Sequence, residues 1–426
     1  MARKLLLLIP KVPVQSYLIA IAVGGLESRQ IGPRSHVWAE PGLVDRAAHD
    51  FAETESFLKT AEDLCGPYVW GTYDILVLPP SFPYGGMENP CLTFATPTLL
   101  SGDRSNAGVI AHEIAHSWTG NLVTNTNFEH FWLNEGFTVF TELKIKGRLF
   151  GEPARHFAAM LRWKDLEETI EVVRGVDDPF TALVPKLAGC DPDDAFSCVP
   201  YVKGSTFLWH LEDLVGGADV FEPFLKSYYE KFAFKSIDSD QFKAYFLEKF
   251  NKLENVKGID WETWLYSPGM PPVKPDFITS LAEACWELAE AWQAWKPSNQ
   301  SPDLPHDFLL FSTDQKIEFL MVLTKGVSLS LETLEVMDTM YKLTKCPNTE
   351  IEFKWLRLGI KARWEKAVTP ALDLVTRQGR MKFVRPIYRD LYNWPEQRQR
   401  AIDTFVTNRP TMMHVAADMV AKDLHI

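Results

Sequence analysis

The pattern His112-Glu113-Ile114-Ala115-His116 is the feature that most restricts how this chain can fold. Side chains four residues apart lie on the same face of an α-helix, so a helix over 107–119 would place both imidazoles beside one metal ion. Glu113 is turned by about 100° from His112 around the helix axis, so its carboxylate can reach the same site without being a ligand. The pattern therefore predicts a helix that carries part of a zinc site together with a catalytic base.

A second acidic motif supplies a third ligand. Catalytic zinc is commonly held by three protein ligands with one position left open, and two histidines with one glutamate are an established set. Glu135 begins the next helical segment, within Trp-Leu-Asn-Glu-Gly at 132–136, and two antiparallel helices joined by the loop 120–128 would bring it to the histidines. We therefore expect His112, His116 and Glu135 to hold one Zn2+ per chain, with Glu113 as the base. The alternative is a surface helix with incidental histidines.

Glu142 follows Glu135 by seven residues, which is two helical turns, so both side chains lie on the same helix face. Ligand histidines in zinc sites commonly donate their other ring N–H to a carboxylate. Glu142 is therefore a candidate partner for a ligand histidine, and a solvated surface acid is the alternative.

Composition and charge narrow the class of protein. The chain has 426 residues, of which 46% are hydrophobic, and this is enough apolar material for two or three domains. Its 44 basic and 56 acidic residues give a net charge of −12, which argues against nucleic acid as a main partner because such proteins carry a basic face. The six scattered cysteines form no Cys-x-x-Cys pair, which is typical of reduced thiols in a cytoplasmic protein.

The N-terminal residues do not favour a targeting or membrane segment. The apolar run Leu5–Ile9 ends at Pro10, and it is shorter than the roughly 7–15 apolar residues of a signal peptide. The run 17–23 is short, partly β-branched and closed by Gly24-Gly25, so it predicts a buried strand. No stretch of the sequence approaches the about 20 apolar residues that a membrane-spanning helix needs.

Periodicity divides the remaining chain into a mixed first part and a helical second part. The first part has β-structure up to residue 40, helix over 44–65, a strand over 73–78, two helical segments over 105–150 broken at Gly120-Asn121, and more helices over 204–250. Four prolines and one glycine within 267–275 exclude both helix and central strand and predict a stiff hinge. Apart from a polar segment at 297–306, residues 277–426 have helical periodicity, with a capping-box pattern at Ser312–Gln315. A solenoid-like or a simpler all-helical packing domain both fit this pattern.

With these residues in place, the chain resembles the M1 zinc metallopeptidases, and within them the leukotriene A4 hydrolase group, with aminopeptidase B as a near relative. Gly-Gly-Met-Glu-Asn at 85–89 resembles the exopeptidase signature of the family, and the two zinc motifs resemble its metal signature. The likeness runs through nearly the whole chain, with further examples at 66–71, 79–92, 112–125, 266–269 and 379–383.

The resemblance implies an α+β, mainly α fold. Residues 1–25 would be a remnant of an N-terminal β domain, 26–268 a thermolysin-like gluzincin catalytic domain, 269–276 a proline-rich linker, and 277–426 an α-helical, armadillo- or HEAT-like C-terminal domain. Most of the family's N-terminal β domain would lie outside this chain. Because that domain contributes part of the substrate cleft, its absence would expose apolar surface.

The resemblance also implies which residues bind a peptide. A substrate would lie along Tyr84, Gly85, Gly86, Met87 and Glu88, and the Glu88 carboxylate would bind the free amino group, which is largely protonated at neutral pH. Tyr201 would donate a hydrogen bond to the oxyanion of the tetrahedral intermediate. The alternative for Glu88 is a solvated acid in a turn, which the nearby zinc motif disfavours, and read without the family Tyr201 is a core aromatic residue.

The same likeness implies a second substrate, a fatty-acid epoxide of the leukotriene A4 type. Asp193 would direct the attacking water, while Arg380 and Lys382 would anchor the substrate carboxylate, although surface charge on helices is the alternative for all three. Phe196 stands where that group usually carries a tyrosine. The sequence thus predicts a zinc aminopeptidase acting on short peptides, with a lipid epoxide as an additional substrate. The competing hypothesis is a truncated, weakly active or inactive homologue that serves as an interaction scaffold through 277–426.

Overall fold

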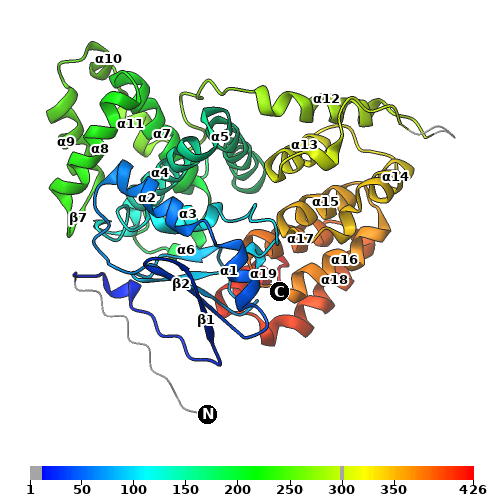
Figure 1. The fold of residues 1–426 in the computed structure, drawn as a ribbon. Helices are drawn as coiled ribbons and strands as arrows, with labels where there is room; N and C mark the ends of the chain where they lie inside the picture. The colour runs from blue at the N-terminus through cyan, green and yellow to red at the C-terminus, as the bar shows by residue number, and fades with distance from the viewer. Residues whose placement is uncertain (1–11, 298–301) are drawn as a thin grey trace.

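The computed structural model describes residues 12–297 and 302–426. The first part of the chain forms a small sheet surrounded by helices, and the last part forms a second group of helices beside it (Figure 1). The mainly helical α+β fold predicted from the sequence is confirmed. The short apolar run Leu5–Ile9 and the first part of the predicted β remnant at 1–25 lie outside the described residues.

The sheet brings its edge strand, β4, against the helix that carries His112 and Glu113. Its five strands run in the order β1-β2-β3-β5-β4, with parallel pairing of β2 with β3 and of β3 with β5, and antiparallel pairing at both edges. All four residues of β3 are buried, and three of them, Ile75–Val77, are apolar, as expected for a strand covered on both faces. The strands are β1 (Glu27–Gly32), β2 (Ser35–Ala39), β3 (Asp74–Val77), β4 (Gly86–Met87) and β5 (Leu92–Ala95).

Helices pack around this sheet and around a second pair of parallel strands, β6 (Val123–Asn125) and β7 (Lys235–Ile237). A large apolar core joins β3 to helices α2, α3, α4, α7 and α8. The helices of this part are α1 (Val44–Asp50), α2 (Thr54–Cys65), α3 (Gly108–Ala115), α4 (Trp132–Phe150), α5 (Glu152–Glu167), α6 (Pro192–Ala195), α7 (Val199–Val215), α8 (Ala218–Phe232), α9 (Ser239–Phe250), α10 (Glu254–Lys257) and α11 (Trp261–Tyr266).

The second group of helices has a core of its own. The capping box predicted at Ser312–Gln315 is present and begins α13. Phe157 and Met160 of α5 also belong to this core, so α5 packs against both groups of helices. The helices are α12 (Ser280–Ala294), α13 (Thr313–Lys325), α14 (Leu331–Tyr341), α15 (Thr349–Lys361), α16 (Val368–Arg377), α17 (Met381–Tyr392), α18 (Pro395–Asn408) and α19 (His414–Asp423). The domain boundaries at 26, 268 and 277 stay predictions.

One secondary-structure prediction is wrong. Instead of a buried strand over 17–23, the chain forms a short 3-10 turn at Ser16–Leu18 and then continues without regular structure. Ile19, Ile21 and Val23 are 72%, 86% and 94% exposed, because no strand of the described part of the chain pairs with this segment. An alternating apolar pattern describes the residues of a strand, but a strand also needs a partner edge. Among the helices within 12–297 and 302–426, none is long and apolar enough to span a membrane.

Helices α4 and α7 approach each other closely at two glycines. A Cβ atom on Gly136 would lie 2.8 Å from Cα of Gly204, and a Cβ on Gly204 would lie 2.9 Å from Cα of Gly136. Both contacts are with backbone atoms, so no side chain can move aside to relieve them. Since α4 carries Glu135 and α7 carries Tyr201, this contact sets the distance between two predicted site residues.

We predict that Gly136→Ala lowers the free energy of unfolding by about 1–3 kcal/mol, because the added methyl group forces the two backbones apart. Gly108→Ala is the matched control: it also lies in a helix, and nothing lies within 4 Å of its added Cβ. This control should be neutral or slightly stabilising. Urea denaturation followed by tryptophan fluorescence measures both variants, and equal midpoints would contradict the prediction.

Candidate metal centre

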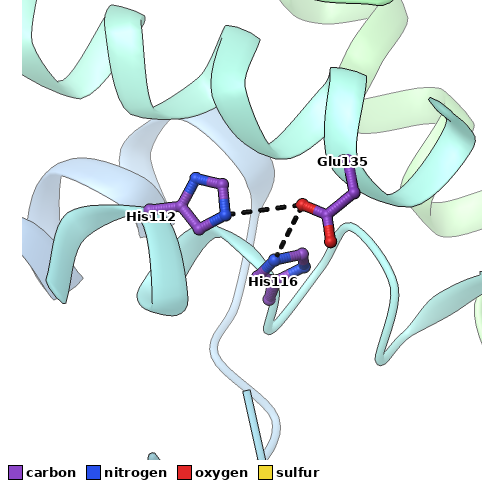
Figure 2. A group of neighbouring side chains, drawn as sticks. All are labelled: His112, His116 and Glu135. Carbon is purple, nitrogen blue, oxygen red and sulfur yellow. Dashed lines mark ion pairs between the residues drawn. The ribbon is translucent and has the colours of Figure 1, made fainter. Parts of the chain in front are cut away.

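Helices α3 and α4 bring the three predicted metal ligands together (Figure 2). Oε2 of Glu135 lies 3.4 Å from Nε2 of His112 and 3.3 Å from Nε2 of His116. Helix α3 ends at Ala115, yet the backbone of His116 is still helical and its N–H bonds to the carbonyl of His112 at 3.2 Å. Both imidazoles therefore keep the four-residue spacing on one face, as the sequence predicts.

These three side chains fit a divalent cation. Glu135 and His116 are buried, at 4% and 1% exposure, and within the described residues Oε2 of Glu135 accepts no hydrogen bond. A buried carboxylate oxygen without a partner is costly, and a cation bound between the three ligand atoms would remove that cost. Burial by itself lowers the pKa of His116, but the carboxylates of Glu88 and Glu135 raise it to about 10. The local field thus favours positive charge at this position, where zinc would lie.

The outer ring nitrogens of both histidines have partners. Nδ1 of His112 lies 3.0 Å from Oε2 of Glu142, and Nδ1 of His116 lies 2.8 Å from the carbonyl oxygen of Thr119. Because these oxygens accept, each Nδ1 carries a proton, and each Nε2 faces the site, where its lone pair would bind zinc in place of a second proton. Although burial by itself raises the pKa of Glu142, a guanidinium and His112 lower it to about 2, so Glu142 is ionised. The contact between Glu142 and a histidine is the one predicted from the sequence.

Other groups around the histidines were not predicted. The hydroxyl of Thr138 lies 3.0 Å from Nδ1 of His116, and Arg162 bonds to Glu142. Thr138 is three residues after Glu135 on α4, so helical spacing alone would have identified it. Arg162 lies on α5, and no local spacing relates it to Glu142. Tyr17 also lies near the metal centre, and its hydroxyl is 3.4 Å from the side-chain amide nitrogen of Asn134. Burial and the Glu88 carboxylate raise the pKa of Tyr17.

The side chain of Glu113 extends from α3 to the edge strand β4. Its side chain is 5% exposed, and it forms a second close acidic group with Glu88 and His116, whose ligand atoms lie within 4.8 Å of one another. A Cβ atom on Gly86 would lie 2.5 Å from Cδ of Glu113, so only glycine lets β4 approach this carboxylate. Burial raises the pKa of Glu113 to about 8, although the two histidines oppose this shift. A carboxyl group so placed can exchange a proton near neutral pH.

An aromatic wall leads away from His112. The rings of His112 and Tyr201 are stacked with centroids 6.1 Å apart, and Phe196 packs edge-on against Tyr201 at 6.2 Å. Tyr84 continues the row, with its ring centroid 5.9 Å from that of Phe196. Burial, together with Glu135 and Glu88, holds the pKa of Tyr201 well above its usual range. Tyr201 is therefore a neutral phenol that can donate a hydrogen bond.

The remaining predicted anionic and cationic residues, Asp193, Arg380 and Lys382, lie on α6 and at the start of α17. Asp193 is exposed on α6, and Tyr84 has a raised pKa because of burial and then because of Asp193. Arg380 is 7% exposed, and a Cβ atom on Gly85 would lie 2.8 Å from its Nη2, so this guanidinium lies against the residue before β4. It is therefore no surface charge. The side chain of Lys382 is more exposed than that of Arg380.

Glu350 holds both cations, and sequence reasoning missed it. One carboxylate oxygen of Glu350 lies 3.4 Å from Nη1 of Arg380, and Nζ of Lys382 donates to both oxygens at 2.8 and 2.7 Å. Burial by itself raises the pKa of Glu350, but Lys382 and Arg380 lower it, so the carboxylate stays ionised. Nη1 of Arg380 also lies 3.4 Å from the hydroxyl of Thr98, and within the described residues its Nε and Nη2 donate no hydrogen bond, so they can serve another acceptor.

Comparison with known proteins agrees with this geometry. Residues 50–264 match the Peptidase family M1 domain, and residues 311–424 match the C-terminal region of leukotriene A4 hydrolase. The chain belongs to peptidase family M1. It is thus an enzyme of a zinc metallopeptidase family, as the motifs predicted.

Relatives in this family cover nearly all of the chain. It is 50% identical over 416 residues to leukotriene A-4 hydrolase of Xenopus laevis, covering 97% of this chain and 68% of that protein. It is 46% identical over 420 residues to leucine aminopeptidase 2 of Emericella nidulans, with 97% and 67% covered. A structure of yeast leukotriene A4 hydrolase in complex with bestatin matches with a TM-score of 0.92 at 43% identity, covering 98% of this chain and 70% of that one. The M1 catalytic fold with a helical C-terminal part is therefore confirmed.

We predict that zinc stabilises this M1 family member through His112, His116 and Glu135. Adding zinc to protein stripped with a chelator should raise its melting temperature by several degrees, since a ligand at 100 times its Kd stabilises by about 2.7 kcal/mol. His116→Ala should lose this response. His414→Ala should retain it, because the side chain of His414 is 92% exposed. An equal response in both variants would place the metal elsewhere.

Proposed function

We propose that this M1 family member is a zinc aminopeptidase that removes N-terminal residues from short peptides. One Zn2+ per chain would be held by His112, His116 and Glu135. The observation that carries the proposal is the position of Glu113, a buried carboxylate beside the three ligands that is also packed against the edge strand β4. None of the six cysteines is paired, which supports a reducing, cytoplasmic location.

We assign each step of peptide cleavage to a residue of this chain. When bound, zinc polarises the scissile carbonyl and makes the attacking water more acidic. Glu113 takes a proton from that water as its oxygen bonds to the carbonyl carbon, and later delivers the proton to the leaving amine nitrogen. Tyr201 donates its phenolic hydrogen to the oxygen that gains negative charge, and its raised pKa keeps it a donor.

The restriction to chain ends follows from Glu88. Its carboxylate lies just after β4 and close to Glu113, so a peptide lying along Gly85 and Gly86 would place its terminal ammonium against Glu88. A charged amine paired with a partly buried carboxylate binds more tightly than a neutral internal residue at the same place. The glycines leave room for the peptide backbone beside the strand.

We predict that Glu113→Gln lowers the turnover of aminoacyl-arylamides by about 100- to 10,000-fold while zinc content stays near one per chain, because the amide cannot accept the proton. Glu290→Gln is the matched control, since Glu290 is exposed on α12. Kinetics with purified proteins and metal analysis measure both quantities. Equal activity of the two variants would rule out this mechanism, and a zinc-loaded but inert wild-type protein would favour the scaffold hypothesis.

A second activity, the hydrolysis of a fatty-acid epoxide, is supported by Arg380. This cation is 7% exposed, and it lies near the aromatic wall of Tyr84, Phe196 and Tyr201, a combination that suits a long apolar substrate with a carboxylate head. Asp193, at the far end of that wall, would direct water to the epoxide carbon. Water adds across the opened C–O bond, so no other reactant is needed. One relative of this chain is named leukotriene A-4 hydrolase.

We predict that Arg380→Ala separates substrates by whether they carry a carboxylate. Turnover of a fatty-acid epoxide and of free tripeptides should fall at least tenfold, because a charge-assisted hydrogen bond contributes about 1.5–3 kcal/mol. Aminoacyl-arylamides have no carboxylate and serve as the internal control, with a smaller loss expected. The ratio of kcat/KM values measures this difference. An equal loss for all substrates would show that Arg380 supports the fold rather than binding a carboxylate.

A further inference from the structure

Helix α5 lies between the helices of the metal centre and the C-terminal helices (Figure 1). On one side, Nζ of Lys164 bonds to Glu318 of α13, a side chain with no exposed surface, and Asp165 lies 3.4 Å from Nζ of Lys354 on α15. Two residues before Lys164, Arg162 bonds to Glu142 of α4. Helix α5 is therefore held by the C-terminal helices while one of its side chains reaches the surroundings of a predicted zinc ligand.

Glu142 is shared between two partners. Its Oε2 lies 3.0 Å from Nδ1 of His112, and its Oε1 accepts a hydrogen bond from Nη2 of Arg162. The side chain of Glu142 is only 12% exposed, so its carboxylate depends on these two partners rather than on water. Lys146 lies one turn along α4, but its ammonium is engaged by Asp314 at 2.5 Å. Arg162 is thus the cation that fixes the second oxygen of Glu142.

We propose that Arg162 is a positioning residue for the metal centre. By holding Oε1 of Glu142, it keeps Oε2 aimed at Nδ1–H of His112, and this fixes both the tautomer and the ring orientation that direct Nε2 to the zinc. Without the guanidinium, the carboxylate can rotate away from His112, and this loosens the ring. The inference rests on the proposed zinc site, and the role of Arg162 is to act on that site through Glu142.

An ordinary ion pair between two helices would behave differently. An isolated pair at the surface contributes roughly 0–1 kcal/mol to stability and has no effect on a distant ligand. A group that orients a metal ligand, in contrast, commonly changes metal affinity by about 10- to 100-fold. Zinc affinity therefore distinguishes the two roles, and it requires no substrate.

The experiment measures zinc binding to the full chain, stripped of metal, by competition with a chromogenic chelator. Arg162→Met should lower zinc affinity about tenfold, and Glu142→Gln should lower it at least as much. If Arg162 acts through Glu142, the double variant should bind zinc no more weakly than Glu142→Gln alone. Arg162→Lys should recover much of the affinity, because a cation returns beside Oε1.

Arg148→Met is the matched control. Arg148 lies in the last turn of α4 and also pairs with a glutamate, Glu222 of α8. The side chain of Arg148 is 52% exposed. Its zinc affinity should equal that of the wild type, and melting temperatures of the metal-free proteins identify any variant that folds poorly. Arg162→Lys serves as the folded variant if Arg162→Met does not fold, and it should then bind zinc more weakly than wild type.

Three results would overturn the inference. They are unchanged zinc affinity in Arg162→Met, an equal loss in Arg148→Met, and additive losses in the double variant. In each of these cases a wild-type protein that binds zinc tightly leaves the proposed aminopeptidase intact. If the wild type itself binds no zinc, the proposed function fails, and the positioning role fails with it.

Discussion

A buried carboxylate oxygen between two imidazoles is the constraint on which the rest of the site depends. Oε2 of Glu135 lies about equally far from both Nε2 atoms and accepts no hydrogen bond among the described residues. The partners on the far side of each ring, Glu142 and the carbonyl of Thr119, fix the protons on Nδ1. The three ligand atoms therefore present lone pairs to one point, and a buried cluster of this kind is stable when a cation occupies it.

Close contacts at three glycines set the distances between the proposed metal ligands and the other proposed site residues. Gly86 lets the edge strand approach Glu113, so the proposed base lies between the proposed metal ligands and the strand along which a peptide would bind. Gly136 and Gly204 bring α4 and α7 together, and these helices carry Glu135 and Tyr201. Glycines at such positions are required by space and not by backbone conformation, since a methyl group at each would overlap neighbouring atoms.

The parts of the site that follow from helical spacing could be predicted from the sequence. The pairing of His112 with His116 and the placement of Glu142 on the same helix face as Glu135 follow from a period of 3.6 residues. The arrival of Glu135 from the next helix follows instead from two helices joined by a short loop and from the need of catalytic zinc for a third ligand. Arg162 and Glu350 could not be predicted in this way, because each meets its partner from another helix and no motif relates the two side chains. The strand predicted over 17–23 failed for a related reason, since the residue pattern does not reveal whether a partner edge exists.

X-ray absorption spectroscopy at the zinc edge identifies the atoms that surround the metal. If His112, His116 and Glu135 hold the zinc, the loaded protein has a first shell of two imidazole nitrogens at about 2.0–2.1 Å and oxygen donors at about 2.0–2.2 Å, with no sulfur. His112→Ala should remove one imidazole from that shell. A shell containing sulfur at about 2.3 Å, or an unchanged shell in the variant, would contradict the account.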